Sequence, residues 1–186
     1  MNLYIKNMVC SRCVSAVENI LKQLDIPFIS VQLGEVKLAD EINGEMLQLL
    51  ESRLNDIGFE IINDKKGRLI EQIKNTIIEL VHRPEEHLKI NISDFLADKL
   101  HYDYNYLSNL FSEIEGTTIE KYYISQKIEK VKELLVYDEL SLNEISYQLG
   151  YSSAAYLSNQ FKKVTGLTPG HFKNIKSVKR IPLDSV

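Results

Sequence analysis

The feature that most constrains the fold of this chain is an internal repeat in its second half. The segment YLSNLF at residues 106–111 recurs as YLSNQF at residues 156–161, at an offset of 50 positions. Upstream, residues 92–100 match residues 141–149 at an offset of 49, so the second copy has one extra residue in its turn. A repeat of this length predicts two copies of one supersecondary unit.

Each copy has the pattern of a helix, a short turn and a second helix. Asp103 is suited to cap the second helix of the first copy, and Ser141 with Glu144 predicts a capping box at the start of the second copy. Gly150 lies in the turn of the second copy, where a positive φ is easy for glycine, and His101 takes that place in the first copy. The repeat therefore predicts two helix-turn-helix units.

A longer helix is predicted between the two copies. The stretch from Thr117 to Glu120 predicts a capping box that opens it, and apolar residues from Ile124 to Leu135 follow at helical spacing. This helix would fix the distance between the two copies. After the second copy, Pro169 stands at the first position of a last short helix.

The first 64 residues show alternating strand and helix patterns. Four segments are strand-like, namely residues 3–5, 28–33, 35–39 and 59–62. Apolar residues recur at helical spacing over residues 12–24 and 47–57. The order β-α-β-β-α-β predicts a ferredoxin-like domain. The predicted fold class is therefore α+β, with a ferredoxin-like N-terminal domain followed by an all-α double helix-turn-helix domain.

Four parts of the chain are predicted. They are the ferredoxin-like domain at residues 1–64, a helical connector at 65–87, the double helix-turn-helix domain at 88–175 and a basic tail at 176–186. The apolar stripe of the connector fits either packing on the following domain or dimerisation. No apolar run approaches the ~18 residues needed to span a bilayer, and residues 1–9 do not resemble a signal peptide. A cytoplasmic protein is therefore expected.

The net charge of −4 at pH 7 argues against a chain that is basic throughout, but the two repeats carry opposite charges. Residues 145–183 contain six basic residues and no Asp or Glu. Residues 90–120 contain one Lys and six acidic residues, a net charge of −5. Contacts to phosphate supply most sequence-independent affinity for DNA. The second copy is therefore predicted to anchor the chain on DNA, and the first copy to contribute less.

The segment SLNEISYQLGYSSAAYLSNQFKKVTGLTPGHFK at residues 141–173 resembles the DNA-binding domain of AraC-type transcription regulators. The resemblance covers residues 88–175. It implies two helix-turn-helix units in one chain, with recognition helices that enter successive major-groove faces on one side of the duplex. On the second recognition helix, helical spacing predicts that Tyr156, Leu157 and Phe161 point inward.

The outward positions of the two recognition helices are the predicted DNA-contacting residues. They are Ala154, Ala155, Ser158, Asn159, Lys162 and Lys163 in the second copy and Asn105, Ser108 and Asn109 in the first. Asparagine can pair with adenine, alanine and serine can approach a thymine methyl group, and lysine suits phosphate. No arginine is available there for guanine, so a site rich in A·T pairs is the hypothesis.

Both cysteines of the chain lie in the segment MVCSRC at residues 8–13. Cys13 is expected in the first turn of a helix and Cys10 just before it, where backbone N–H groups, the helix dipole and Arg12 favour a thiolate. Two thiolates suit Cu(I), whereas structural zinc usually takes four ligands and would need the cysteines of two copies. Thiol redox chemistry, or a pair without a chemical role, are the alternatives.

This segment, together with Gly58 and Phe59 before the last strand, resembles the heavy-metal-associated domain of copper chaperones and metal-transporting ATPases. In that family the two matching cysteines bind a soft metal ion. A glycine usually stands where this chain has Asn7. The resemblance implies a site for Cu(I) or Zn at Cys10 and Cys13.

Together these patterns predict a sequence-specific, DNA-binding transcription regulator of the AraC type with a metal- or thiol-responsive N-terminal input. Two alternatives stay open: an N-terminal protein-interaction or dimerisation domain without a metal role, or a soft-metal chaperone. No enzyme is predicted, because no nucleophile–base arrangement, zinc-protease spacing or phosphate-binding loop is present. Double-stranded DNA is the expected partner, a second copy of the chain or RNA polymerase are further candidates, and no membrane contact is expected.

Overall fold

The computed structural model describes residues 1–62, 64–82, 91–137 and 139–174. The chain divides into two compact units, Met1–Asn75 and Thr76–Val186. The division falls inside one helix, α3 (Lys65–His82), which occupies most of the predicted connector. The end of that connector and the predicted basic tail lie outside the described residues.

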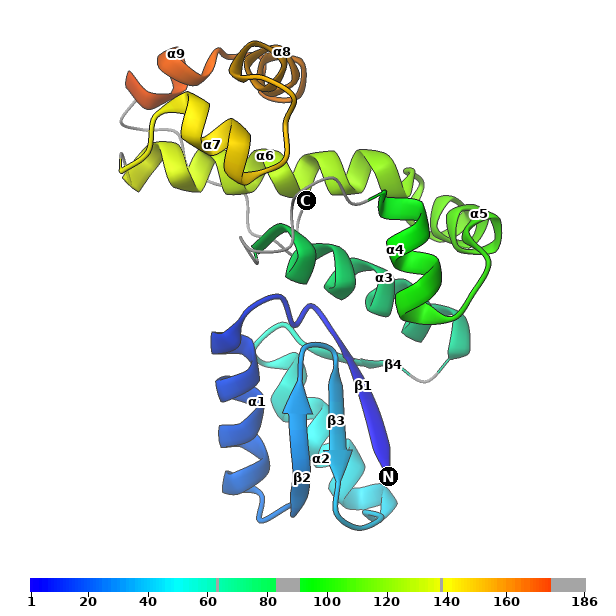
Figure 1. Cartoon of the computed structure of the whole chain (residues 1–186). Coiled ribbons are helices and arrows are strands. Elements are labelled where there is room, and N and C mark those ends of the chain that lie inside the picture. The colour runs from blue at the N-terminus through cyan, green and yellow to red at the C-terminus, as the bar shows by residue number, and fades with distance from the viewer. Residues whose placement is uncertain (63, 83–90, 138, 175–186) are drawn as a thin grey trace. The chain divides into compact units, whose positions relative to one another are not determined.

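The first unit contains a small antiparallel sheet and two helices (Figure 1). Its elements are β1 (Asn2–Lys6), α1 (Ser11–Gln23), β2 (Phe28–Gln32), β3 (Glu35–Leu38), α2 (Gly44–Asn55) and β4 (Glu60–Ile62). The strands lie in the order β2-β3-β1-β4, and each neighbouring pair is antiparallel. The register pairs Leu3 with Val36 and Ile5 with Ile61. Leu3 and Ile5 are two residues apart on β1, so both pairs lie on the same face of the sheet.

One face of this sheet forms a core with α1 and α2, because apolar residues alternate along the strands. Leu3 and Ile5 on β1 are buried, and Val36 and Leu38 repeat the alternation on β3. The helices contribute side chains at helical spacing, namely Val17, Leu21, Leu50 and Leu54. This shared core fixes the start of α1, and with it the position of the cysteine segment.

The β2–β3 hairpin turns at Gly34, whose φ is 76°. A Cβ atom at this position would collide with the side-chain amide of Asn75 on α3. Both the left-handed backbone and the close approach of Asn75 therefore favour glycine here. The contact also shows that the first half of α3 belongs to the first unit.

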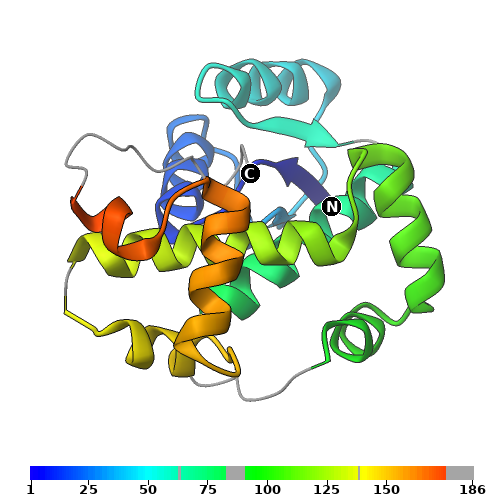
Figure 2. The ribbon, with the colours of Figure 1, turned by 90° about the horizontal axis from the view of Figure 1, so that it is seen from above.

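The second unit is helical. After the end of α3 its described helices are α4 (Ile92–Leu100), α5 (Tyr104–Glu115), α6 (Ile119–Tyr137), α7 (Leu142–Gln148), α8 (Ala154–Thr165) and α9 (Pro169–Asn174). The pairs α4–α5 and α7–α8 are the two helix-turn-helix units, and α6 runs past both of them (Figure 2). The predicted pair of helical units is thus confirmed. None of the described helices combines the length and apolar character needed to cross a bilayer.

The turns inside the two units follow the predicted chemistry. His101 has φ 59° and Gly150 has φ 64°, so the same left-handed turn occurs in both copies. Ser141 and Glu144 form the predicted capping box: the N–H of Ser141 donates to Glu144 Oε2 at 2.7 Å, and the N–H of Glu144 donates to Ser141 Oγ at 3.3 Å.

The capping box predicted from Thr117 to Glu120 is wrong by one residue. Thr118 Oγ1 accepts the N–H of Lys121 at 3.2 Å, and α6 begins at Ile119. Because the cap lies at Thr118, the side chain three positions later is a lysine, which cannot return the reciprocal hydrogen bond of a capping box.

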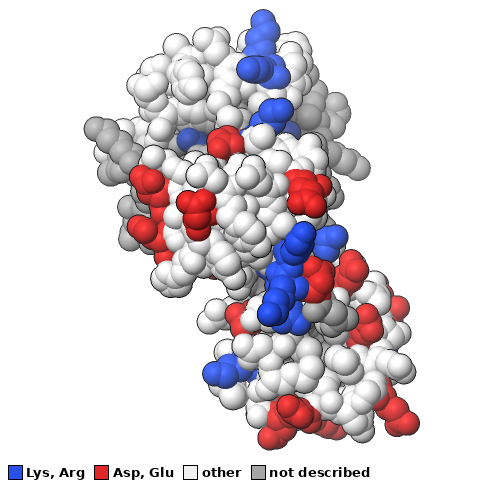
Figure 3. Space-filling model, turned by 90° about the vertical axis from the view of Figure 1, so that its right-hand side faces the viewer, with Lys and Arg blue, Asp and Glu red and all other residues white. Residues whose placement is uncertain are grey.

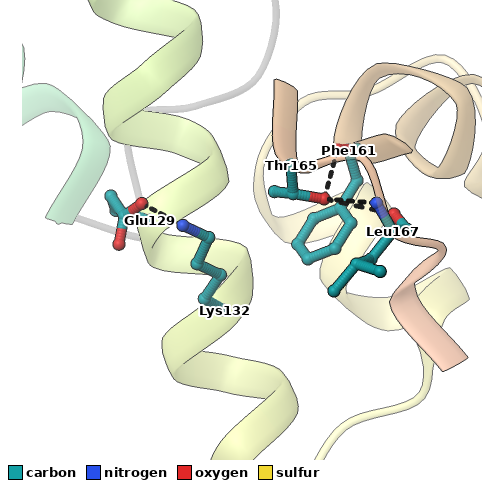
Figure 4. Close-up of polar contacts among 5 residues, drawn as sticks. All are labelled: Glu129, Lys132, Phe161, Thr165 and Leu167. Atoms are coloured by element: carbon teal, nitrogen blue, oxygen red, sulfur yellow. Dashed lines mark hydrogen bonds and ion pairs between the residues drawn. The ribbon is translucent and has the colours of Figure 1, made fainter. Parts of the chain in front are cut away.

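Helix α6 is buried along much of its length. Its apolar side chains Ile128, Val131 and Leu135 belong to the core of the second helix-turn-helix. Glu129 and Lys132, which are 3% and 7% exposed, form an ion pair one turn apart (Figure 4). Removal of either partner would leave an uncompensated buried charge, at a cost of about 3–5 kcal/mol.

Candidate nucleic-acid interface

Polar contacts fix both ends of α8, the helix predicted to contact DNA. At its start, Ser153 Oγ accepts the N–H of Tyr156 at 3.1 Å. At its end, Thr165 Oγ1 donates to the carbonyl of Phe161 at 2.8 Å and accepts the N–H of Leu167 at 3.1 Å (Figure 4). The outward face of α8 is therefore presented by a helix with defined limits.

The inward face of α8 is held by Leu157 and Phe161, both fully buried. The ring of Phe161 meets Phe172 of α9 edge to face, with centroids 5.5 Å apart and planes at 75°. An aromatic pair in this geometry contributes about 0.5–1.5 kcal/mol beyond the burial of its area. The inward orientation predicted for these two α8 residues is confirmed.

The inward orientation predicted for Tyr156 is wrong. Its side chain is 54% exposed, and its ring lies 6.1 Å from the ring of Tyr151. Consecutive helix residues point about 100° apart, so Tyr156 turns outward when its neighbour Leu157 faces the core. An exposed tyrosine is thus added to the surface that the sequence assigns to DNA.

The predicted contact residues of α8 lie at its surface. Ala155, Asn159, Lys162 and Lys163 are exposed, and Ala154 and Ser158 are partly exposed. Ala155, Asn159 and Lys162 follow one another at spacings of four and three, so they share one face of the helix. That face combines an amide, a small side chain and an ammonium group, a set suited to base edges and phosphates.

Helix α5 presents the equivalent positions of the first copy. Asn105 and Asn109 are exposed and Ser108 is partly exposed. At the position equivalent to Lys163, α5 has the exposed Glu113. Figure 3 shows several acidic side chains on the side of the second unit that carries α4 and α5. The two helix-turn-helix units thus offer the same backbone geometry with opposite charge.

A hydrogen bond that the sequence did not predict joins α5 to α6. Tyr104 Oη donates to Glu120 Oε1 at 2.5 Å. This hydrogen bond lowers the pKa of Glu120. Burial and the same carboxylate raise the pKa of Tyr104 above its usual range. The two residues are 16 positions apart in different helices, so no local pattern could reveal the pair.

Replacing Tyr104 by phenylalanine is expected to destabilise the protein by up to about 1 kcal/mol at neutral pH, because Glu120 is exposed and Tyr104 is only partly buried. In the wild type, this contribution is fully present above the ordinary Glu120 pKa of 4.5 and is lost as the pH falls through the lowered value. Urea unfolding at pH 7 and at about pH 3 should therefore show a difference between the two proteins that shrinks in acid. An equal difference at both pH values would contradict this account.

The two cysteines lie together at the start of α1. Cys10 is the N-cap residue, Cys13 is in the first turn, and their sulfur atoms are 3.2 Å apart. Burial opposes ionisation of Cys10, but hydrogen bonds from Cys13 and Arg12 and the charge of Arg12 outweigh it and lower the Cys10 pKa. Burial raises the pKa of Cys13, and the neighbouring Cys10 adds to that rise. Cys10 is therefore the first of the two thiols to lose its proton, and the thiol of Cys13 then donates a hydrogen bond to the Cys10 sulfur.

The cysteine pair offers two sulfur ligands to a metal ion. Within the described ranges, no group of three or more His, Cys, Asp or Glu side chains is arranged to hold a metal ion. A site built on Cys10 and Cys13 from these residues alone would therefore be a two-ligand site.

Asn7 anchors the loop that leads to these cysteines. Its φ of 70° is left-handed, a conformation that glycine adopts most easily and asparagine tolerates. Its Nδ2 donates to the carbonyl of Gly58 at 3.0 Å, and its backbone N–H donates to Glu71 Oε2 at 3.4 Å. The loop is thus tied to the α2–β4 turn and to α3, and asparagine fits where the resemblance implies a glycine.

Comparison with known proteins finds a family model that matches most of the second unit. Residues 96–175 match the family model described as a helix-turn-helix domain. The uncharacterised HTH-type transcriptional regulator YtdP of Bacillus subtilis (strain 168) is 28% identical over 116 residues, which cover 62% of this chain and 15% of that protein. The xylose operon regulatory protein of Escherichia coli (strain K12) is 32% identical over 102 residues, which cover 54% of this chain and 26% of that protein.

The fold agrees with a solved structure. The C-terminal domain of AraT, a response regulator from Geobacillus stearothermophilus, superposes with a TM-score of 0.53 at 22% identity, covering 62% of this chain and 92% of that domain. This chain spans about a quarter or less of the length of the two curated relatives. With two helix-turn-helix units along one long helix, residues 96–175 are thus similar to the helix-turn-helix DNA-binding domains of transcription regulators.

Proposed function

We propose that this chain is a sequence-specific DNA-binding transcription regulator whose main DNA contact is α8. The observation that carries the proposal is the outward face of α8, where Asn159, Lys162 and Lys163 are exposed on a helix fixed at both ends. The match of residues 96–175 to the helix-turn-helix family and the similarity to two regulators support it. A DNA partner of this kind implies a place in the cytoplasm.

In this proposal α8 enters the major groove. Asn159 forms paired hydrogen bonds with adenine, and Ala155 and Ser158 approach thymine methyl groups. Lys162 and Lys163, nearer the end of the helix, bind phosphates. Since α8 contains no arginine, the preferred site is rich in A·T pairs.

The first helix-turn-helix contributes less to affinity in this proposal. Asn105, Ser108 and Asn109 can reach base edges, but Glu113 repels phosphate at the position where Lys163 attracts it. Binding therefore depends mainly on the second copy.

Selection from a library of random-sequence duplexes, followed by anisotropy titrations at several salt concentrations, tests this proposal. Selected duplexes should be rich in A·T pairs. The logarithm of the affinity should fall linearly with the logarithm of the salt concentration, by about 0.9 for each phosphate contacted. Absence of any enriched sequence, or an affinity that does not depend on salt, would refute DNA recognition by this chain.

We further propose that the first unit is a ferredoxin-like domain of the heavy-metal-associated type and serves as an input. The strand order β2-β3-β1-β4 and the cysteine pair at the start of α1 support this assignment. The donor set of Cys10 and Cys13 fits Cu(I), a soft ion that accepts two sulfur ligands. Zinc would need further ligands, which a second copy of the chain could supply.

The anchoring of Asn7 suggests how this input acts on the DNA-binding half. Glu71, which accepts the N–H of Asn7, lies on α3, and α3 continues without a break past the division at Thr76. A change at Cys10 and Cys13 that moves their loop would alter the Asn7–Glu71 contact. A metal ion at Cys10 and Cys13 changes the affinity for DNA only if the metal-bound and metal-free forms differ in the Asn7–Glu71 contact.

Three other readings of the first unit make different predictions. Reversible thiol oxidation fits the lowered pKa of Cys10 and requires no metal. An interaction or dimerisation domain requires neither metal nor thiol chemistry. A soft-metal chaperone would pass its ion to an acceptor protein while DNA affinity stays constant. Binding to a second copy of the chain or to RNA polymerase stays a prediction.

Replacing Cys10 and Cys13 by serine is expected to abolish Cu(I) binding, because a hydroxyl is a hard and weak ligand for a soft ion. Competition with a chromogenic Cu(I) chelator should give one ion per wild-type chain and none for the variant. Ser11→Ala, which keeps both thiols, is the matched control and should bind as the wild type does. Equal chelator competition by the wild type and the double variant would exclude the metal input.

A further inference from the structure

Lys127 is a buried lysine on α6 that the proposed DNA contact does not use. Its side chain is 9% exposed. Its Nζ lies 3.8 Å from the ring centroid of Tyr151 and 5.4 Å from that of Tyr123. Within the described part of the chain, the ammonium group therefore meets aromatic faces, which attract cations most strongly where water is excluded.

Tyr151 connects this lysine to the recognition helix. It follows Gly150 in the turn between α7 and α8, is 9% exposed, and donates its N–H to the carbonyl of Ser146 at 2.8 Å. Its ring lies 6.1 Å from the ring of Tyr156, in the first turn of α8. A continuous series of contacts thus leads from Lys127 on α6 to the exposed start of α8.

The phenol oxygen of Tyr151 is buried and has no hydrogen-bond partner among the described residues. A buried hydroxyl without a partner is unfavourable, so the hydroxyl does not explain why a tyrosine ring is held at this place. The face of the ring, which contacts Lys127, is the part of the residue that makes a specific interaction.

The corresponding tyrosine of the first copy has different surroundings. Tyr102 is the residue equivalent to Tyr151 at the offset of 49, and it stacks on Tyr106 with centroids 5.7 Å apart. Tyr102 is however 49% exposed, whereas Tyr151 is covered. Both copies therefore have the tyrosine pair, but in the second copy a lysine from α6 holds it.

We propose that Lys127 is a positioning residue for DNA recognition: its ammonium group fixes the ring of Tyr151, and through it the first turn of α8, relative to α6. This inference rests on the proposed DNA-binding function of α8. Lys127 itself is covered by protein, so it would act without touching a phosphate. Its effect would be on the geometry of the recognition helix.

The charge state of Lys127 gives the proposal a pH signature. Burial lowers the pKa of Lys127 to about 8. The groups that face it, Tyr123 on α6 and Tyr151 in the turn, have pKa values raised by burial and stay neutral over this range. Loss of the proton would remove the attraction to both rings and release the turn, so DNA affinity should fall as the pH rises above about 8.

Anisotropy titrations of Lys127→Met and Lys127→Arg on one selected duplex test the proposal. Lys127→Met should bind about 5–30-fold more weakly, with the salt dependence of the wild type. Lys127→Arg should recover most of the affinity. From pH 7 to about 9.5 the wild type should lose affinity relative to Lys127→Arg, because guanidinium keeps its charge.

Two ring variants keep the test valid if Lys127→Met folds poorly. Tyr151→Phe keeps the ring and should bind as the wild type does, whereas Tyr151→Leu should lose affinity as Lys127→Met does. Wild-type affinity in Lys127→Met would overturn the proposal, as would a salt slope reduced by about one, which would mean a direct phosphate contact. Failure of the wild type to select any duplex is a different result, since it removes the proposed function itself.

Discussion

Replacing Lys162 and Lys163 by glutamate is expected to reduce the affinity for DNA by at least ~10²-fold at an ionic strength of about 0.15 M. Both side chains are exposed in the last turn of α8, in a stretch of the chain that lacks acidic residues. Each substitution removes an attraction to phosphate and adds a repulsion. The slope of log affinity against log salt should also become shallower, by about 0.9 for each phosphate that the variant no longer neutralises.

The first copy supplies a matched control for this charge reversal. Glu113 on α5 is the position equivalent to Lys163, so Glu113→Lys gives α5 the charge that α8 already has. If α5 also lies near phosphates, Glu113→Lys should tighten binding and steepen the salt slope. If only α8 contacts DNA, the variant should bind as the wild type does. A Lys162→Glu/Lys163→Glu variant with wild-type affinity and slope would be incompatible with α8 as the main contact.

Replacing Phe161 by alanine is expected to destabilise the second helix-turn-helix by about 3–5 kcal/mol. The ring is fully buried in the same core as Leu157, Ile128 and Phe172. Its removal leaves a cavity and takes away the edge-to-face contact with Phe172. Amide hydrogen exchange in α8 and α9 measures the effect directly, because opening of this unit exposes those amides.

Two variants serve as controls for Phe161→Ala. Val164→Ala changes a 46% exposed side chain on the same helix and should cost less than about 0.5 kcal/mol. Phe111→Ala removes the equivalent buried ring of the first copy and should raise exchange in α5 more than in α8. Unchanged exchange in α8 of Phe161→Ala would mean that this ring does not hold the recognition helix.

The repeat made much of the second unit predictable from the sequence. Similarity at a fixed offset located both turns, and turn chemistry then placed His101 and Gly150 in the left-handed region. Spacing also identified which α8 residues reach solvent, since Asn159, Lys162 and Lys163 are indeed exposed. Their contact with DNA stays a prediction, because exposure does not show what covers a surface.

The errors came from choices that differ by one residue. Tyr156 and Leu157 are adjacent, and only one of two consecutive helix residues can face a core squarely. Thr117 and Thr118 are equally good caps by composition, and the geometry selects Thr118. In both cases the pattern predicted the right kind of structure, and only the folded structure shows which of the two neighbouring residues takes the role.

Long-range polar contacts were beyond the sequence for another reason. A lysine in an amphipathic helix is normally assigned to the solvent face, so nothing in the pattern around Lys127 indicated burial. The pairing of Tyr104 with Glu120 and of Asn7 with Glu71 depends on elements that meet only after folding. The cysteine spacing did predict a pair at a helix start, but the difference between their pKa values came from their surroundings.

The continuous helix α6 also sets a rotational phase between the two helix-turn-helix units. The helix has 19 residues. Adding or deleting one residue in it would shift one helix-turn-helix unit relative to the other by ~1.5 Å along the helix axis and rotate it by ~100° about that axis. In the proposed DNA complex the distance along the duplex would barely change, whereas α8 would no longer face the major groove. The length of α6 thus fixes the rotation of one helix-turn-helix unit relative to the other. Related domains should therefore keep the number of residues in this helix even where the residues themselves differ.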